Sequence, residues 1–445
     1  MTRHRILLLA VLILGCARGT AGQAPSQRGF VEGRLQFYPQ ETAGDRQVFA
    51  DGLFRQEVGW TPAGWLTIAG AFDARADRDE RVERGWTVDW SDRGAWRPAL
   101  SLRRLSVAQR RGGLTVEAGK QLVRWGKADI LNPTDRFAPR DFLEVVDADY
   151  LPVTAGRVMW ERGANTIDLV VSRFTPSRIP TLASRWAAQG SGLRAQALSH
   201  RGGVTGLEPE ALSLEPSSAA EFAALGFGPS VGIVAGGASY PSRPQAGMRW
   251  SHIGEGVEFS ASIYDGFNHL PRFDGRLDPA LGAIVLTREH TPMRMYGADA
   301  AWPLRWLTVK GEVGYFTSRR EAATEYGVFV LQLERQTGEW FLVGGYAGEF
   351  VTSAGADLEF SPERGLGKTF LGRASYTIDA NRSVAFEGAV RQTGRGAYLE
   401  AEFSQGVGQH WRVTASATLI RGREDDFLGQ FRKNSNARVT FRYSY

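Results

Sequence analysis

The end of the chain alternates strictly between apolar and polar side chains. Ala437, Val439, Phe441, Tyr443 and Tyr445 fall on one side of an extended backbone, and the polar residues between them fall on the other. A period of two is typical of a β-strand with one apolar and one wet face. Chain ends usually fray. A large aromatic that completes the pattern therefore predicts a terminus paired into a sheet.

The same alternation recurs along the chain in about eighteen segments of about 9 to 12 residues. Among them are FVEGRLQFY near the start, VEFSASIYD in the middle and WRVTASATLI near the end. Ten residues tilted by about 40° rise roughly 25 Å, the height of the apolar band of an outer-membrane barrel. Strands of soluble sandwiches are usually about 5 or 6 residues long. The pattern predicts an all-β fold, a transmembrane antiparallel β-barrel of about 16–18 strands.

Connections between these segments alternate in length, which supports a barrel in a membrane. Short ones are expected at 61–64, 110–113, 161–165, 252–256, 303–306, 336–339, 378–382 and 406–410. Longer polar stretches lie between them, near 39–46, 75–97, 124–153, 175–244, 267–291, 318–325, 351–366 and 421–433. Short turns on one side and long loops on the other are typical of outer-membrane barrels, whose short turns face the periplasm.

Tryptophan gives an independent indication of the same fold. Eight of the thirteen tryptophans lie in or beside the short connections: Trp60, Trp65, Trp160, Trp250, Trp302, Trp306, Trp340 and Trp411. Indole rings favour the membrane–water interface, where the ring is buried and the N–H stays hydrated. Ordinary core tryptophans would have no reason to gather at one end of the strands.

The first residues have the features of a secretory signal peptide. Arg3 and Arg5 precede a short apolar run, and small residues follow, with a cleavage site expected after Gly22. We therefore expect a signal peptide at 1–22 and a barrel at 23–445. An alternative is lipoprotein processing before Cys16, which Leu14 disfavours. Removal of three arginines by cleavage after Gly22 lowers the formal net charge from +5 to +2, so the charge does not argue for nucleic acid binding.

The most distinctive segment is GKQLVRWGKADILNPTDRFAPRDFLEVVDADYLPV, at 119–153, in the third expected outer loop. Charges of both signs in a narrow pore create a transverse field that orients polar solutes. If the loop folds inward, it forms a constriction; the alternative is a loop that packs on the rim or plugs the lumen. The candidate constriction residues are Arg124, Lys127, Asp129, Asp135, Arg136, Arg140 and Asp141.

The WGKAD…NPTD…PRD words of that segment, together with RMYGADAAWPLRWLTVKGEVGYF at 294–316, resemble a poorly characterised family of porin-like outer-membrane barrels of Gram-negative bacteria. The similarity extends over most of the chain after the signal peptide. It implies a barrel with a channel-like role and assigns no ligand. The loop at 175–244, rich in Ala, Gly, Ser and Pro, matches no known pattern.

We expect a porin-like channel for passive diffusion of small polar solutes, and no cofactor. The residues expected to line the lumen are Arg34, Lys310, Glu312, Arg373, Glu387, Arg391, Glu400, Arg412, Arg438 and Arg442. The alternative is an export or receptor barrel for a lipid or polysaccharide. A hydrolase is disfavoured because no nucleophile motif is present, and His269 with His290 makes a poor metal or catalytic pair. No catalytic or metal residue is assigned.

The expected partners follow from the expected location in the bacterial outer membrane. They are outer-membrane lipid, lipopolysaccharide, small solutes and the barrel-insertion machinery, with a homo-oligomer left open. The terminal aromatics Phe441, Tyr443 and Tyr445 resemble the sorting signal that the insertion machinery reads.

Overall fold

The structure is a computed structural model that describes residues 24–42, 46–78, 81–129, 131–180, 184–186, 232–278, 283–355 and 361–445. The expected signal peptide at 1–22, and 187–231 of the expected 175–244 loop, lie outside the described residues.

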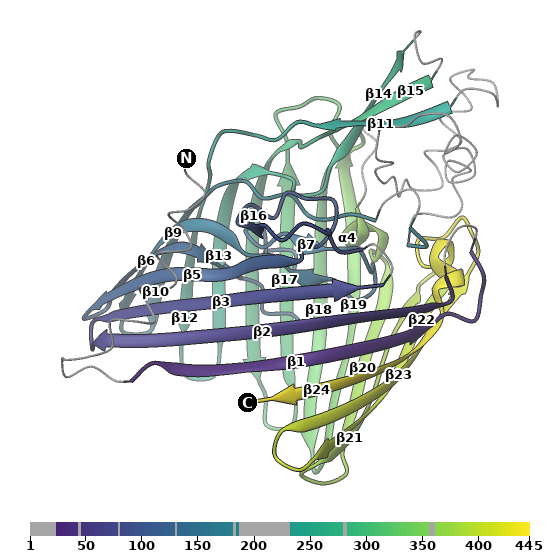
Figure 1. Cartoon of the computed structure of the whole chain (residues 1–445). Helices are drawn as coiled ribbons and strands as arrows, with labels where there is room; N and C mark the ends of the chain where they lie inside the picture. The colour runs from purple at the N-terminus through teal and green to yellow at the C-terminus, as the bar shows by residue number, and fades with distance from the viewer. Residues whose placement is uncertain are drawn as a thin grey trace.

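Eighteen antiparallel strands form one closed barrel (Figure 1). This confirms the predicted fold class, at the upper end of the expected strand number. In order around the wall, the strands are β1 (Ser26–Phe37), β2 (Val48–Ala63), β3 (Leu66–Asp77), β5 (Leu100–Arg111), β6 (Leu114–Gln121), β9 (Val153–Arg162), β10 (Asn165–Ser172), β12 (Gln245–Ile253), β13 (Glu258–Phe267), β16 (Pro292–Pro303), β17 (Thr308–Thr317), β18 (Glu325–Thr337), β19 (Trp340–Ser353), β20 (Thr369–Thr377), β21 (Arg382–Arg391), β22 (Gly396–Val407), β23 (Trp411–Gly422) and β24 (Asn436–Ser444).

Pairing of the first and last strands closes the barrel. β1 and β24 run antiparallel from Phe30↔Ser444 to Phe37↔Ala437. Beyond β24, Tyr445 and Gly29 exchange two backbone hydrogen bonds of 3.1 Å. The terminal residue is thus paired, as its alternation predicts. Closure removes the free strand edges, whose unpaired backbone N–H and C=O groups would find no hydrogen-bond partner in the hydrocarbon of the membrane.

Alternation along each strand separates an apolar outer face from a polar inner face. On β24, Phe441 is 45% exposed at the outer surface, whereas Arg442 points inward and pairs with Glu32. Seven of the eight tryptophans near the short turns are at least 38% exposed, the exception being Trp60. An apolar band with tryptophans gathered at one end is the surface that an outer-membrane barrel presents to lipid.

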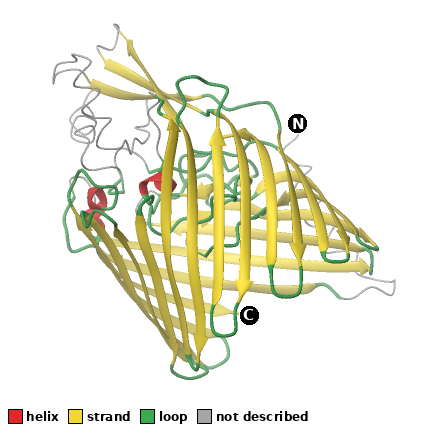
Figure 2. Ribbon diagram, turned by 180° about the vertical axis from the view of Figure 1, so that it is seen from behind, coloured by secondary structure: helices red, strands yellow, loops and turns green. Residues whose placement is uncertain are grey.

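The two ends of the barrel differ, as Figure 2 shows: tight turns close one end, and longer loops gather at the other. Gly112, Gly163, Gly338 and Gly408 all have positive φ angles of 55–64° in the short turns. A backbone in this left-handed region favours glycine, which has no Cβ to clash. By the outer-membrane convention, the tight-turn end is periplasmic and the long-loop end external.

Short elements lie among the external loops. They are β4 (Val88–Asp89), β7 (Arg140–Asp141), β8 (Asp149–Tyr150), β11 (Gly232–Ala238), β14 (Arg272–Asp278), β15 (Ala283–Glu289), the helix α4 (Pro362–Gly365) and the 3-10 helix η2 (Gly429–Asn434). β11, β15 and β14 form a separate sheet that projects above the barrel in Figure 1. None of the helices in the described ranges is long and apolar enough to cross a membrane.

The hydrophobic core lies inside the barrel, where the segment between β6 and β9 packs against the wall. Trp125 and Phe137 meet edge to face with ring centroids 5.0 Å apart, and Phe137 packs in the same way on Tyr264 of β13. Gly247 of β12 permits this contact, since a Cβ there would lie 2.8 Å from both the Trp125 and the Phe137 ring. The lumen is therefore partly filled by its own loop.

Candidate functional site

The segment 122–152, between β6 and β9, is attached to the barrel wall at β17. The Glu312 carboxylate accepts hydrogen bonds from the backbone N–H groups of Lys127, Ala128 and Thr134 at 2.9, 3.0 and 2.9 Å, and from the Thr134 hydroxyl at 2.9 Å. Next to this contact, Asp129 pairs with Lys310 of β17 at 3.1 Å. One wall carboxylate thus satisfies three otherwise unpaired amides of the loop.

The same segment is attached to the seam between β1 and β24. Glu144 pairs with Arg34 of β1 at 3.2 Å and with Arg438 of β24 at 3.4 Å. Asp147 pairs with Arg438 at 2.7 Å. In the strand order, β17 lies roughly opposite this seam. Because 122–152 contacts both sides of the wall, the segment crosses the lumen.

The part of the crossing segment nearest β6 has its own polar core. Asp135 accepts hydrogen bonds from the backbone N–H groups of Trp125 and Gly126 at 2.5 and 2.7 Å, and pairs with Arg124 at 3.1 Å. The indole N–H of Trp125 donates to Asp168 of β10 at 2.9 Å. These bonds fix the direction in which the chain leaves β6.

A buried ion-pair network holds the middle of the segment. Asp141 pairs with Arg97 at 2.9 Å and with Arg178 at 3.3 Å. Burial opposes ionisation of Asp141, but the two guanidinium groups outweigh it and hold its pKa well below the ordinary value. Glu144 behaves in the same way: burial is outweighed by Arg34 and Arg438, which lower its pKa to about 2. Both carboxylates are ionised at neutral pH.

A second external segment is fixed to the seam by Arg185. Its guanidinium donates to the backbone oxygens of Gln40, Arg46 and Lys433 at 2.9, 3.2 and 3.4 Å, and stacks 3.6 Å from the centre of the Tyr38 ring. Arg185 is only 1% exposed. The stretch 184–186 therefore lies over the ends of β1 and β24. The residues that follow β10 are described as far as 180.

A cavity of about 320 Å³ remains between the crossing segment and the wall formed by β20, β21 and β22. Leu371, Ala389 and Tyr398 contribute the wall side, and Leu366, Phe427 and Phe431 from the external loops cover it. Its charged lining residues are Arg124, Asp129, Arg140, Asp147, Glu363 and Glu387. This space combines an apolar side with charged groups of both signs.

The expected constriction residues divide into two groups. Arg124, Asp129 and Arg140 line the cavity. The remaining four make contacts that hold the segment in place: Lys127 pairs with Glu258 at 2.7 Å, Asp135 binds backbone amides, Arg136 is buried against Glu363 at 2.7 Å, and Asp141 pairs with Arg97. Arg136 is 7% exposed, so burial separates it from Arg124.

The residues expected to line the lumen take several places. Arg34, Arg438, Lys310 and Glu312 contact the crossing segment, and Glu387 lines the cavity and pairs with Arg373 at 3.6 Å. Four others bond within the wall or near its external end: Glu400 accepts from Tyr398 at 3.0 Å, Arg412 donates to Ser404 at 3.0 Å, Arg442 pairs with Glu32, and Arg391 pairs with Asp426 at 3.2 Å.

Several cavity residues were not among the candidates from the sequence. Tyr150 contacts two arginines, with its ring centre 4.1 Å from the Arg124 guanidinium and 4.5 Å from that of Arg140. Phe427, Phe431 and Leu366 come from external loops far along the chain. The only local signal for them is apolar residues within otherwise polar loops, and this signal does not show where they pack.

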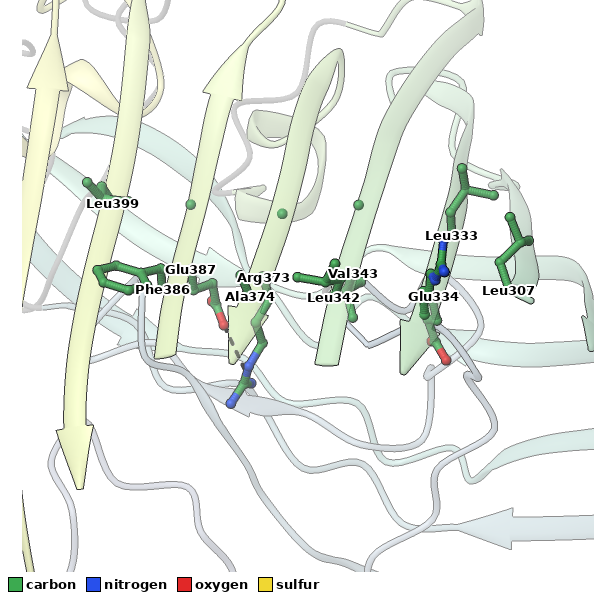
Figure 3. Close-up of a pocket in the computed structure, with 14 residues that line it drawn as sticks. Leu307, Leu333, Glu334, Leu342, Val343, Arg373, Ala374, Phe386, Glu387 and Leu399 are labelled. Atoms are coloured by element: carbon green, nitrogen blue, oxygen red, sulfur yellow. Dashed lines mark ion pairs between the residues drawn. The ribbon is translucent and has the colours of Figure 1, made fainter. Parts of the chain in front are cut away.

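A second hollow lies on the outward face of the barrel. Its volume is about 560 Å³, and the exposed side chains of Leu333, Leu342, Phe386 and Leu399 border it (Figure 3). The hollow lies over glycines at 344, 372 and 388 on neighbouring strands, which have no side chains to fill it. The hollow faces lipid and is not part of the lumen.

The described residues contain no group of three or more His, Cys, Asp or Glu that could hold a metal ion. His269 and His290 both pack on the Phe174 ring, at centroid distances of 5.3 and 4.6 Å. His269 also contacts the backbone oxygens of Thr175 and Arg136. Both histidines thus have packing partners in the external loops.

Comparison with solved structures finds similarity to porins. A BenF-like porin from Pseudomonas fluorescens Pf-5 aligns over 95% of this chain and 98% of its own, with a TM-score of 0.51 and 11% identity. OccD3 (OpdP) of Pseudomonas aeruginosa aligns over 96% and 93%, with a TM-score of 0.49 and 10% identity. An engineered Rhodopseudomonas blastica porin aligns over 95% and 100%, with a TM-score of 0.42 and 10% identity.

No protein-family model matches the sequence, and no curated protein sequence matches it. At these identities the likeness concerns the fold alone. The resemblance of the 119–153 and 294–316 segments to one porin-like family therefore stays a prediction. A closed barrel with an apolar outer band and a polar interior is an outer-membrane β-barrel that crosses the bilayer with its strands.

Proposed function

We propose that the protein is a porin-like channel through which small polar solutes diffuse across the bacterial outer membrane, and that segment 122–152 forms its constriction. The observation that carries this proposal is the attachment of that segment to opposite sides of the wall, through Glu312 and through Glu144, with a cavity left beside it. A loop held in this way narrows the lumen without filling it.

The interior suits polar solutes. Ion pairs such as Arg34–Asp51 and Arg55–Asp73 lie on the inner wall, at 2.8 and 2.7 Å. A barrel of 18 strands is wide enough to leave an aqueous path beside an inward loop. The alternative function, export or reception of a lipid or polysaccharide, is supported less well because charged pairs line this wall.

The proposed transport involves no enzymatic step. The partners that follow from this proposal are small solutes in the lumen and outer-membrane lipid, including lipopolysaccharide, around the apolar band. Assembly requires the barrel-insertion machinery.

Planar-bilayer recording of the purified full-length barrel tests the proposal. Stepwise conductance in KCl is expected, with each step corresponding to one inserted channel. Correctly folded protein, identified by its heat-modifiable mobility on gels, that inserts and stays silent would overturn the channel function. A variant that lacks 124–150 tests the constriction separately, since it should conduct more than the complete chain.

A further inference from the structure

The charges around the 320 Å³ cavity are balanced except at one residue. Each of the four lining carboxylates has a cationic partner: Asp129 has Lys310 at 3.1 Å, Asp147 has Arg438 at 2.7 Å, Glu363 has Arg136 at 2.7 Å and Glu387 has Arg373 at 3.6 Å. Of the two lining cations, Arg124 pairs with Asp135 at 3.1 Å. Arg140 forms no ion pair with any carboxylate in the described part of the chain.

The contacts of Arg140 orient it without neutralising it. Its guanidinium donates to the Tyr150 hydroxyl at 2.6 Å and stacks on the same ring, 4.5 Å from its centre. Burial raises the pKa of Tyr150 to about 12, so the phenol is neutral and supplies no counter-charge. An arginine carries five donor hydrogens in a planar fork that matches a carboxylate. Within the described residues, the guanidinium donates one hydrogen bond, to Tyr150, which leaves its other donors for a ligand in the cavity.

The opposite side of the cavity is apolar. Leu366, Leu371, Phe427 and Phe431 belong to three different parts of the chain and meet here. Leu371, Phe427 and Phe431 are buried, at 6%, 8% and 0% exposed, whereas Leu366 is half-buried. A solute with a hydrocarbon body would contact this apolar side and remove from water the part of it that is still exposed, chiefly at Leu366.

We propose that this cavity is a binding site for small amphipathic carboxylates, with the carboxylate on Arg140 and the hydrocarbon body on the Leu366–Leu371–Phe427–Phe431 side. The inference rests on the proposed channel function and names the class of solute that the constriction favours. Arg124 also lies beside Tyr150, with its guanidinium 4.1 Å from the ring centre, but its charge is already paired with Asp135.

Interruption of the KCl current through single channels measures binding to this site. Hexanoate is the probe, and two solutes each change one property: acetate keeps the charge without the long tail, and hexylammonium keeps the tail with the opposite charge. Added to the external side of the wild-type channel, hexanoate should interrupt the current at least tenfold more strongly than either of them. Equal interruption by all three would overturn the inference.

Substitution of Arg140 tests the residue assignment. Arg140→Gln should weaken interruption by hexanoate about tenfold or more, measured against the open-channel KCl current of the same variant. Arg140→Lys should recover part of the effect, because it restores the charge without the planar fork. The matched control is Arg412→Gln, which removes an inward wall arginine outside the cavity, bonded to Ser404 at 3.0 Å, and should leave interruption unchanged.

The outcomes separate this inference from the channel proposal. A correctly inserted barrel that carries no current in KCl would overturn both the channel function and the carboxylate site. A conducting barrel in which Arg140→Gln and Arg412→Gln behave alike would overturn the carboxylate site and leave the channel standing. If Arg140→Gln does not assemble, the comparison of hexanoate, acetate and hexylammonium on the wild-type channel still decides the question.

Discussion

The Glu312 carboxylate on the barrel wall accepts two hydrogen bonds from Thr134, one from its backbone N–H and one from its hydroxyl, both at 2.9 Å. These two residues are separated by 178 positions in the chain. Together with the bonds from Lys127 and Ala128, this contact determines how far the crossing segment projects from the wall.

Glu312→Gln is expected to loosen that segment. An amide group turns an N–H donor toward the backbone N–H groups that the carboxylate satisfies, so at least one strong bond is lost, at a cost on the order of 2 kcal/mol. Single-channel recordings should show a noisier open state with a larger mean conductance. The matched control is Glu402→Gln on β22, which should have the open-state noise and the mean conductance of wild type. An unchanged open state in Glu312→Gln would contradict the role of this carboxylate as an anchor.

Ion preference should respond to Arg124 more than to an external charge. Arg124 lines the cavity, where screening by salt is incomplete, whereas Asp425 is nearly half-exposed and lies beside Arg423 in an external loop. Under a salt gradient, Arg124→Glu should move the reversal potential clearly toward cation preference, and Asp425→Lys should move it little. Equal small shifts in both variants would place the cavity outside the conduction path.

Arg136→Glu, by contrast, should impair assembly. The new carboxylate would lie buried beside Glu363, the present partner of Arg136 at 2.7 Å, with no cation in place of the one removed. The expected cost is about 3 to 5 kcal/mol, and the heat-modifiable fraction should fall. Arg136→Glu combined with Glu363→Arg restores opposite charges and should recover part of the loss; no recovery would argue against this pair.

Acid should release the crossing segment at the β1–β24 seam. The pKa of Glu144 is lowered from 4.5 to about 2. The ionised carboxylate therefore stabilises the attached segment by about 3 kcal/mol; this stabilisation is complete above about pH 4.5 and is lost as the pH falls toward 2. Conductance should be steady from about pH 7 to pH 5 and become noisier below about pH 4. Glu144→Gln should show the noisy state already at pH 7. A conductance and a noise level that do not change with pH down to about 2 would contradict the role of Glu144 in holding the segment.

Removal of the Tyr445 side chain should affect assembly more than stability. Its ring is 47% exposed, and its hydroxyl donates to Gln56 at 2.6 Å, so Tyr445→Ala removes little buried surface. We expect less assembled barrel in the outer membrane, with the free energy of unfolding of the assembled fraction changed by no more than about 1 kcal/mol. If the Tyr445→Ala variant gives as much heat-modifiable barrel in the outer membrane as wild type, this would count against the sorting role.

The barrel itself could be predicted from the sequence. Alternation such as Val439, Phe441 and Tyr443 is a property of neighbouring residues, because successive side chains of a strand point to opposite faces. Turn glycines and the tryptophans beside them carry equally local information. A range of about 16–18 strands, the paired terminus and the two unlike ends of the barrel follow from these patterns, because hydrocarbon excludes unpaired backbone.

The arrangement inside the barrel was decided by the tertiary structure. The sequence places Arg124, Arg136 and Arg140 in one charged segment and does not distinguish them. Folding pairs the first with Asp135, buries the second against Glu363 and sets the third against Tyr150, with no carboxylate partner among the residues that the structure describes. The reason is physical: ion pairs and loop contacts depend on distances between residues such as Glu144 and Arg438, which are 294 positions apart and meet only when β1 and β24 close the wall. Local periodicity specifies which way a side chain faces; closure of the barrel determines what it meets there.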